Sequence, residues 1–145
     1  MHGPLQVPKE FYELYKHVPD ERRRRYLAMV RWLDTAVSNV TQLLKTHGMY
    51  DDALIVFTSD NGGPIYFGGS GGANNYPLKG GKTSNWQGGI RVNAFVYGGL
   101  IPEAMRGRKL DGLGAVWDWY ATFARLAGVV DTVDRAAATM ELPPI

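Results

Sequence analysis

The stretch Ala53-Leu54-Ile55-Val56-Phe57-Thr58-Ser59, followed by Asp60-Asn61-Gly62-Gly63, decides the fold class of this 145-residue chain. A short, continuous apolar run that is rich in branched residues and follows a helical pattern is typical of a buried strand in a parallel sheet. Residues 92–97 (VNAFVY) predict a second strand, and a glycine-rich loop lies between the two runs. The order helix, strand, long loop, strand, helix indicates an α/β fold.

Two helices flank these strands. The first helix is predicted to begin after Asp20, which would be its N-cap residue, and to end at Gly48. Its apolar face is formed by Tyr26, Met29, Val30, Leu33, Val37, Val40 and Leu44, which recur at helical spacing. The second is predicted over residues 113–127, ending at Gly128. Its inward face would comprise Val116, Tyr120, Phe123, Ala124 and Ala127. Residues 1–19 are predicted as an extended arm with one short helical turn, and residues 135–140 as a weak helix.

Composition excludes several classes of function. The formal charge is only +2, which does not support nucleic-acid binding. The absence of cysteine excludes a disulfide scaffold, a thiolate zinc site and a cysteine nucleophile within these residues. No apolar run approaches the roughly 20 residues of a membrane span. The basic run Arg22–Arg25 indicates a solvated face or, alternatively, a contact with an anionic ligand.

Asp60 and Asn61 are the first candidate functional residues. Ligands bind at the carboxyl ends of strands in α/β sheets, and this pair follows directly after the first predicted strand. A carboxylate and an amide oxygen suit Ca²⁺ or Mg²⁺. The alternative is an Asn-Gly turn without a ligand. Because Ca²⁺ takes about 6–8 oxygens, most of a metal site would have to come from elsewhere.

Lys82 and two further residues complete the candidates. Lys82 lies among glycines that allow close approach of a ligand, so its ammonium is either an anion contact or an exposed charge in a loop. The sequence around it lacks the spacing of a nucleotide-binding P-loop. His2 is an isolated histidine, and Asn39-Val40-Thr41 fits the N-glycosylation pattern or arises by chance.

Together these segments resemble the sulfatase family, specifically its arylsulfatase B-like branch. The similarity extends from residue 2 to about residue 128. The matching segments, in order, are His2–Pro8, Tyr26–Val30, Asp34–Thr41, Phe57–Gly63, Asn75–Lys82 and Trp86–Arg91.

The resemblance implies part of an alkaline-phosphatase-like α/β sandwich that hydrolyses sulfate esters. In the family a formylglycine, made from cysteine or serine, is the nucleophile, and a Ca²⁺ ion holds it together with a sulfate oxygen. By the same resemblance, Asp60 and Asn61 match two metal ligands, and Lys82 a lysine at the sulfate. His2 matches a histidine at the sulfate and the leaving-group oxygen. The substrate would be a sulfated small molecule or glycan.

The sequence also departs from the family pattern. The nucleophile motif, the N-terminal aspartate pair of the metal site and the first cationic residues of the sulfate pocket are not found in it. Gln87 stands where many members have glutamate, and Ala115 stands near a common histidine. We therefore expect residues 1–145 to be the middle of a longer sulfatase catalytic domain, inactive alone, whose full-length parent is exported or lysosomal.

Two other functions agree with the same residues. One is a noncatalytic protein derived from a sulfatase that binds calcium or an anion. The other is a sister phosphodiesterase or phosphonate hydrolase. Oligomeric state and exact substrate stay open at this point.

Overall fold

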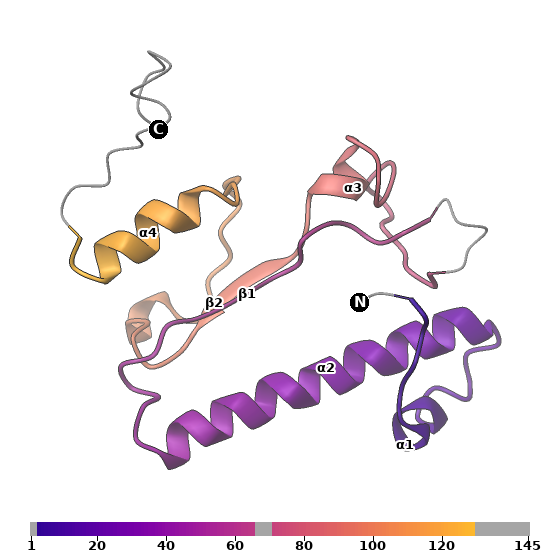
Figure 1. The fold of residues 1–145 in the computed structure, drawn as a ribbon, viewed down its shortest axis with the longest axis horizontal. Coiled ribbons are helices and arrows are strands. Elements are labelled where there is room, and N and C mark those ends of the chain that lie inside the picture. The colour runs from indigo at the N-terminus through magenta and orange to yellow at the C-terminus, as the bar shows by residue number, and fades with distance from the viewer. Residues whose placement is uncertain (1–2, 66–70, 130–145) are drawn as a thin grey trace. The chain divides into compact units, whose positions relative to one another are not determined.

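A computed structural model describes residues 3–65 and 71–129 of the chain. The chain divides into two compact units, residues 1–106 and residues 107–145. The described part of the first unit contains the helices α1 (Lys9–Glu13), α2 (Glu21–Thr46) and α3 (Gln87–Ile90), the strands β1 (Ile55–Thr58) and β2 (Ala94–Tyr97), and a 3₁₀ turn at Glu103–Met105. The described part of the second unit contains α4 (Asp118–Leu126). Figure 1 shows these elements along the chain.

The predicted N-terminal arm is confirmed, and its helical turn is α1. This helix packs beside the first turns of α2 (Figure 1). The Arg24 guanidinium joins the two segments, since its Nε and Nη2 donate to the Val18 carbonyl at 3.0 and 2.8 Å. Its Nη1 donates to the Tyr12 hydroxyl at 3.1 Å, and the guanidinium lies 5.1 Å from the centre of the Tyr12 ring. These contacts hold the arm against the helix.

The arginine run at the start of α2 is only partly the solvated face that was predicted. Besides Arg24, Arg23 donates from Nη1 to the Gly72 carbonyl at 3.0 Å. Arg25 pairs with Glu21 at 2.6 Å, and this hydrogen bond raises the pKa of Arg25 above its ordinary value. The guanidinium groups of Arg23, Arg24 and Arg25 therefore bind the chain itself, because the helix start lies between the arm and the glycine-rich loop.

Both predicted ends of α2 are confirmed. Asp20 is the N-cap, and its Oδ1 accepts from the Arg23 N–H at 2.6 Å. At the other end, Gly48 has φ +65°, a conformation that glycine adopts without steric cost. Gly48 N–H donates to the Lys45 carbonyl at 3.1 Å and Met49 N–H to the Leu44 carbonyl at 2.8 Å. This pair of bonds is the Schellman motif that ends many helices.

The prediction of a parallel sheet is wrong for the strands described. β1 and β2 pair antiparallel, with Ile55 opposite Tyr97 and Thr58 opposite Ala94. The loop of residues 59–93 leaves and returns at the same end of the pair, which is the geometry of an enlarged hairpin. Parallel strands would need a crossover to the opposite end of the sheet. The strands are also shorter than predicted and only half-buried or exposed.

The core of the described residues is small. Ala28 is the one hydrophobic residue among them that is fully buried. Part of the predicted apolar face of α2 is exposed, as at Val40 (52% exposed). Packing elsewhere includes the stacked rings of Phe57 and Phe95, whose centroids are 4.8 Å apart. The Thr41 and Tyr97 hydroxyls are 2.9 Å apart, so a hydrogen bond links α2 to β2.

In the second unit, α4 is shorter than the predicted helix. It begins at Asp118, whose Oδ2 accepts from the Ala115 N–H at 2.7 Å and so holds the preceding turn out of the helix. Its end at Gly128 is confirmed, with φ +82°. The predicted inward orientation is wrong within this unit, where Val116 and Tyr120 are 76% and 73% exposed. The described residues of this unit offer no sheet on which they could pack. The weak helix predicted over residues 135–140 lies outside the described residues.

Replacing Asp20 with alanine is expected to destabilise α2. The change removes the 2.6 Å hydrogen bond that satisfies the Arg23 N–H. Loss of such a cap costs about 1 kcal/mol. Thermal unfolding of the chain followed by circular dichroism at 222 nm measures the effect. Asp20→Asn is the matched control, because asparagine caps equally well, and an equal loss in both variants would contradict the capping role.

Candidate functional site

Asp60 and Asn61 follow β1 directly, as the sequence predicts for a ligand-binding position. The Ser59 hydroxyl donates to the Asn61 carbonyl at 2.9 Å, and the Asn61 Nδ2 donates to the Gly62 carbonyl at 3.0 Å. The second bond turns the amide nitrogen toward the backbone and leaves Oδ1 as the free oxygen. Asp60 is exposed, and its carboxylate has no hydrogen-bond or ion-pair partner among residues 3–65 and 71–129. The pair therefore presents two available oxygen donors.

The glycine-rich loop brings Lys82 next to this pair. Gly62 N–H donates to the Gly89 carbonyl at 2.8 Å, and Lys82 N–H donates to the Gly63 carbonyl at 3.0 Å. Because Gly63 is two residues beyond Asn61, the backbone of Lys82 is held close to both candidate metal ligands. The structure thus brings the backbone of Lys82 near the adjacent residues Asp60 and Asn61, which lie about twenty positions earlier in the sequence.

Lys82 differs from its neighbour Lys79 in what its ammonium contacts. The Lys79 ammonium lies 3.8 Å from the centre of the Trp86 ring, a cation–π contact that occupies it. Lys82 is half-buried, and its ammonium has no hydrogen-bond, ion-pair or ring partner within the described part of the chain. Of these two loop lysines, Lys82 is the cation available to an anionic ligand.

Close backbone packing shapes the loop around these residues. A Cβ on Gly62 would overlap the Gly88 carbonyl, and one on Gly88 would overlap the Gly80 carbonyl. Gly80 itself has φ +83°, a conformation that favours glycine. The glycines of the motif are therefore required sterically, in addition to leaving space for a ligand as the sequence suggested.

Asn75 has no role predicted from the sequence, and the structure places it between the two sides of the loop. Its side-chain amide binds the backbone of both Gly63 and Gly80. The sequence feature that could have indicated this role is an asparagine between glycine-rich segments. Its side-chain amide can bind backbone N–H and carbonyl groups that would pair with a neighbouring strand in a sheet.

The donor set fits Ca²⁺ in part. Asp60 and Asn61 offer hard oxygen atoms, which Ca²⁺ prefers, and they supply two of its usual six to eight or so ligands. Among residues 3–65 and 71–129, no three His, Asp or Glu side chains gather around one point. His2, the other candidate, lies outside those residues.

Residues 1–129 match the family model described as Sulfatase. This chain belongs to the sulfatase family. Because the matched solved structures cover nearly the whole chain, the predicted fold class, part of the α/β sulfatase fold, is confirmed.

Individual relatives show how much of a sulfatase is present. The chain is 42% identical over 132 residues to arylsulfatase J of Mus musculus and 29% identical over 143 residues to N-acetylgalactosamine-6-sulfatase of Homo sapiens. Those matches cover 90% and 99% of this chain, but only 21% and 26% of the relatives. The crystal structure of Ps i-CgsB in complex with k-i-k-neocarrahexaose matches with a TM-score of 0.82 and 35% identity. That match covers 99% of this chain and 29% of the solved one. The chain thus spans about a fifth to a quarter of the curated relatives.

Within residues 3–65 and 71–129, no helix combines the length and the apolar character that crossing a bilayer requires.

Replacing Gly62 with alanine is expected to destabilise the loop. The added methyl group would collide with the Gly88 carbonyl, a backbone group that cannot swing away as the end of a flexible side chain could. Overpacking of this kind costs about 1–3 kcal/mol. Urea unfolding measures the loss, with Gly114→Ala as control, since a Cβ at Gly114 has open space around it. Equal stability of the two variants would contradict the close packing of the loop.

Proposed function

We propose that these residues form part of a sulfuric ester hydrolase that cleaves sulfate esters. The observation that carries the proposal is the bond from the backbone N–H of Lys82 to the Gly63 carbonyl at 3.0 Å, which holds the Lys82 backbone at the residue two positions after Asn61. Hydrolysis of a sulfate ester needs two positive groups. One is a metal ion, held by oxygen ligands on one side of the sulfate group, and the other is a fixed cation on its other side. Membership of the sulfatase family supports the same reaction.

In this proposal Asp60 and Asn61 are two ligands of a Ca²⁺ ion. The carboxylate supplies negative charge and the amide supplies a neutral oxygen that the Gly62 contact orients. When bound, the ion would polarise a sulfate oxygen and neutralise charge in the transition state. The other ligands and the nucleophile would come from residues beyond the described ones.

Lys82 would contact an oxygen of the sulfate group. Its backbone is held by Gly63 and the residue is half-buried, so part of Lys82 is shielded from water. A fixed charge in a partly desolvated place stabilises developing negative charge more strongly than a mobile surface charge. His2 would donate a hydrogen bond or a proton to the leaving-group oxygen, a role typical of histidine in general acid catalysis.

We further propose that the substrate is a sulfated glycan or a small sulfate ester. The glycan alternative is supported by the solved complex of Ps i-CgsB with k-i-k-neocarrahexaose and by the relatives named N-acetylgalactosamine-6-sulfatase. Export or lysosomal targeting of the full-length protein is part of the proposal. Asn39 of the glycosylation triplet is exposed on α2, where a glycan has room.

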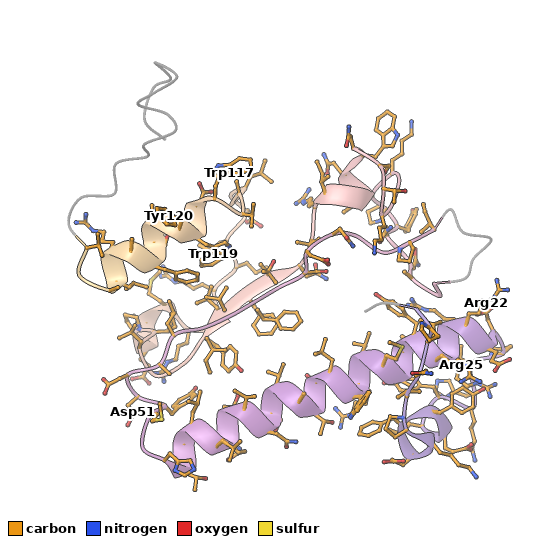
Figure 2. All side chains as sticks on the ribbon, in the orientation of Figure 1. Arg22, Arg25, Asp51, Trp117, Trp119 and Tyr120 are labelled. Atoms are coloured by element: carbon orange, nitrogen blue, oxygen red, sulfur yellow. The ribbon has the colours of Figure 1, made fainter. Side chains whose placement is uncertain are left out.

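In the full-length protein, Asp60→Ala is expected to weaken Ca²⁺ binding by about tenfold or more. Loss of even an indirect partner of a metal ligand commonly costs on the order of 10–100-fold in affinity. Calcium titration by calorimetry measures the change. Asp51→Ala is the matched control, because Asp51 is also an exposed aspartate but lies before β1 (Figure 2). Equal Ca²⁺ affinities of the Asp60 and Asp51 variants would contradict the assignment of Asp60 as a metal ligand.

The 145-residue chain expressed alone is expected to show no hydrolysis of sulfate esters. Lys82 and the Asp60–Asn61 pair can bind an anion or a cation, but binding without a nucleophile leaves the S–O bond intact. An assay with 4-nitrocatechol sulfate, with and without Ca²⁺, measures turnover. Ca²⁺-dependent turnover that Lys82→Ala abolishes would show that these residues suffice for catalysis and that the proposed division of the site is wrong.

A further inference from the structure

Asn75 uses both donor positions and one of the two acceptor positions of its side-chain amide. Its Oδ1 accepts from the Gly63 N–H at 3.0 Å. Its Nδ2 donates to the Gly63 carbonyl at 2.8 Å and to the Gly80 carbonyl at 3.1 Å. All three bonds are partly buried, so water competes poorly for them. One amide thus joins two segments that are separated by 16 residues of chain.

The two segments are those that carry the candidate site. Gly63 lies two residues after Asn61, and Gly80 lies two residues before Lys82. The Gly63 carbonyl also accepts from the Lys82 N–H, so the same backbone group contacts both Asn75 and Lys82. Neither segment belongs to a strand at this point, and Asn75 supplies the pairing that a sheet would otherwise provide.

The space around the amide leaves little freedom for another arrangement. A Cβ on Gly81 would lie 2.5 Å from the Gly63 carbonyl oxygen and 2.9 Å from the Asn75 Nδ2. A Cβ on Gly63 would overlap the Ala73 side chain and lie 3.1 Å from the Asn75 Oδ1. The glycines on both sides therefore form a slot of the size of one amide group.

We propose that Asn75 is a positioning residue that sets the separation between the Asp60–Asn61 pair and Lys82. The inference rests on the proposed function, in which a cation held at Asp60–Asn61 and the Lys82 ammonium contact the same sulfate group. A displacement of about 1 Å between such groups can cost on the order of 100-fold in rate. Asn75 itself touches no substrate in this proposal and acts through Lys82.

Asn75→Asp is the sharpest substitution, because it changes the hydrogen-bonding character with almost no change in shape. The carboxylate still accepts from the Gly63 N–H, but its second oxygen faces the carbonyl oxygens of Gly63 and Gly80, to which Nδ2 donated. Asn74→Asp is the matched control. Asn74 is exposed, and its Oδ1 accepts from the Tyr76 N–H at 2.9 Å, a bond that a carboxylate retains. The two variants carry the same added charge on adjacent residues.

The experiment is a double-mutant cycle in the full-length protein, with kcat/KM for 4-nitrocatechol sulfate as the measured quantity. Asn75→Asp is expected to lower kcat/KM by about tenfold or more, and Asn74→Asp by less than about twofold. In a Lys82→Ala background, Asn75→Asp is expected to cost less than about threefold further, because residues that act through one contact are not additive. Asn75→Ser, which keeps one donor and one acceptor, gives an intermediate loss and serves if the aspartate variant does not fold.

Amide hydrogen exchange of Gly63 and Lys82 provides a measurement that needs no turnover. Exchange at both amides is expected to be faster in Asn75→Asp than in Asn74→Asp, while the amides of α2 stay unchanged. Unchanged exchange at Gly63 and Lys82, or equal losses of kcat/KM with and without Lys82, would overturn the positioning role. Faster exchange in a protein that shows no sulfatase activity, or no loss of activity on Lys82→Ala alone, would overturn the proposed function and leave the link through Asn75 intact.

Discussion

The Gly63 peptide group is the contact on which the arrangement of the site depends. Its N–H donates to Asn75, and its carbonyl accepts from both Asn75 and Lys82. These bonds, together with the Gly62–Gly89 bond, return a long loop to the end of the strand pair from which it left. Without these bonds, nothing would distinguish Lys82 from the other cations of an irregular segment. With these bonds, the backbone of Lys82 is held near the two oxygen donors that follow β1.

Close approach of this kind requires residues without side chains. The backbone groups of Gly62, Gly80 and Gly88 pack so tightly that a Cβ on Gly62 or Gly88 would overlap a carbonyl oxygen. An irregular loop must find partners for its buried backbone groups outside a helix or sheet ladder. Here the partners are other loop carbonyls and one asparagine side chain. The glycine content of the segment is thus a packing requirement, and the site depends on it.

The start of α2 supports the same loop from the other side. Arg23 donates to the Gly72 carbonyl, and a Cβ on Gly72 would overlap the Arg22 carbonyl. Ala73 follows and contacts Gly63, so packing is continuous from the first turn of α2 to the residues that hold Lys82. Meanwhile Arg24 fixes the N-terminal arm through Val18 and Tyr12. A run of four like charges is tolerated at a helix N-terminus because these guanidinium groups find carbonyl, hydroxyl and carboxylate partners.

The sequence by itself determined the local features. Asp20 and Gly48 marked the ends of α2, Gly128 marked the end of α4, and the apolar run before Asp60 marked β1, because caps and hydrophobic periodicity act over a few residues. The position of Asp60 and Asn61 after β1, and of Lys82 among glycines, made them candidates, and resemblance to the sulfatase family then suggested their roles. The antiparallel pairing of β1 with β2, the exposure of Val116 and Tyr120, and the role of Asn75 were decided only by the tertiary structure. Each depends on which distant segment a residue meets, and hydrogen bonds such as those from Asn75 to Gly63 and Gly80 leave no periodic pattern in the sequence.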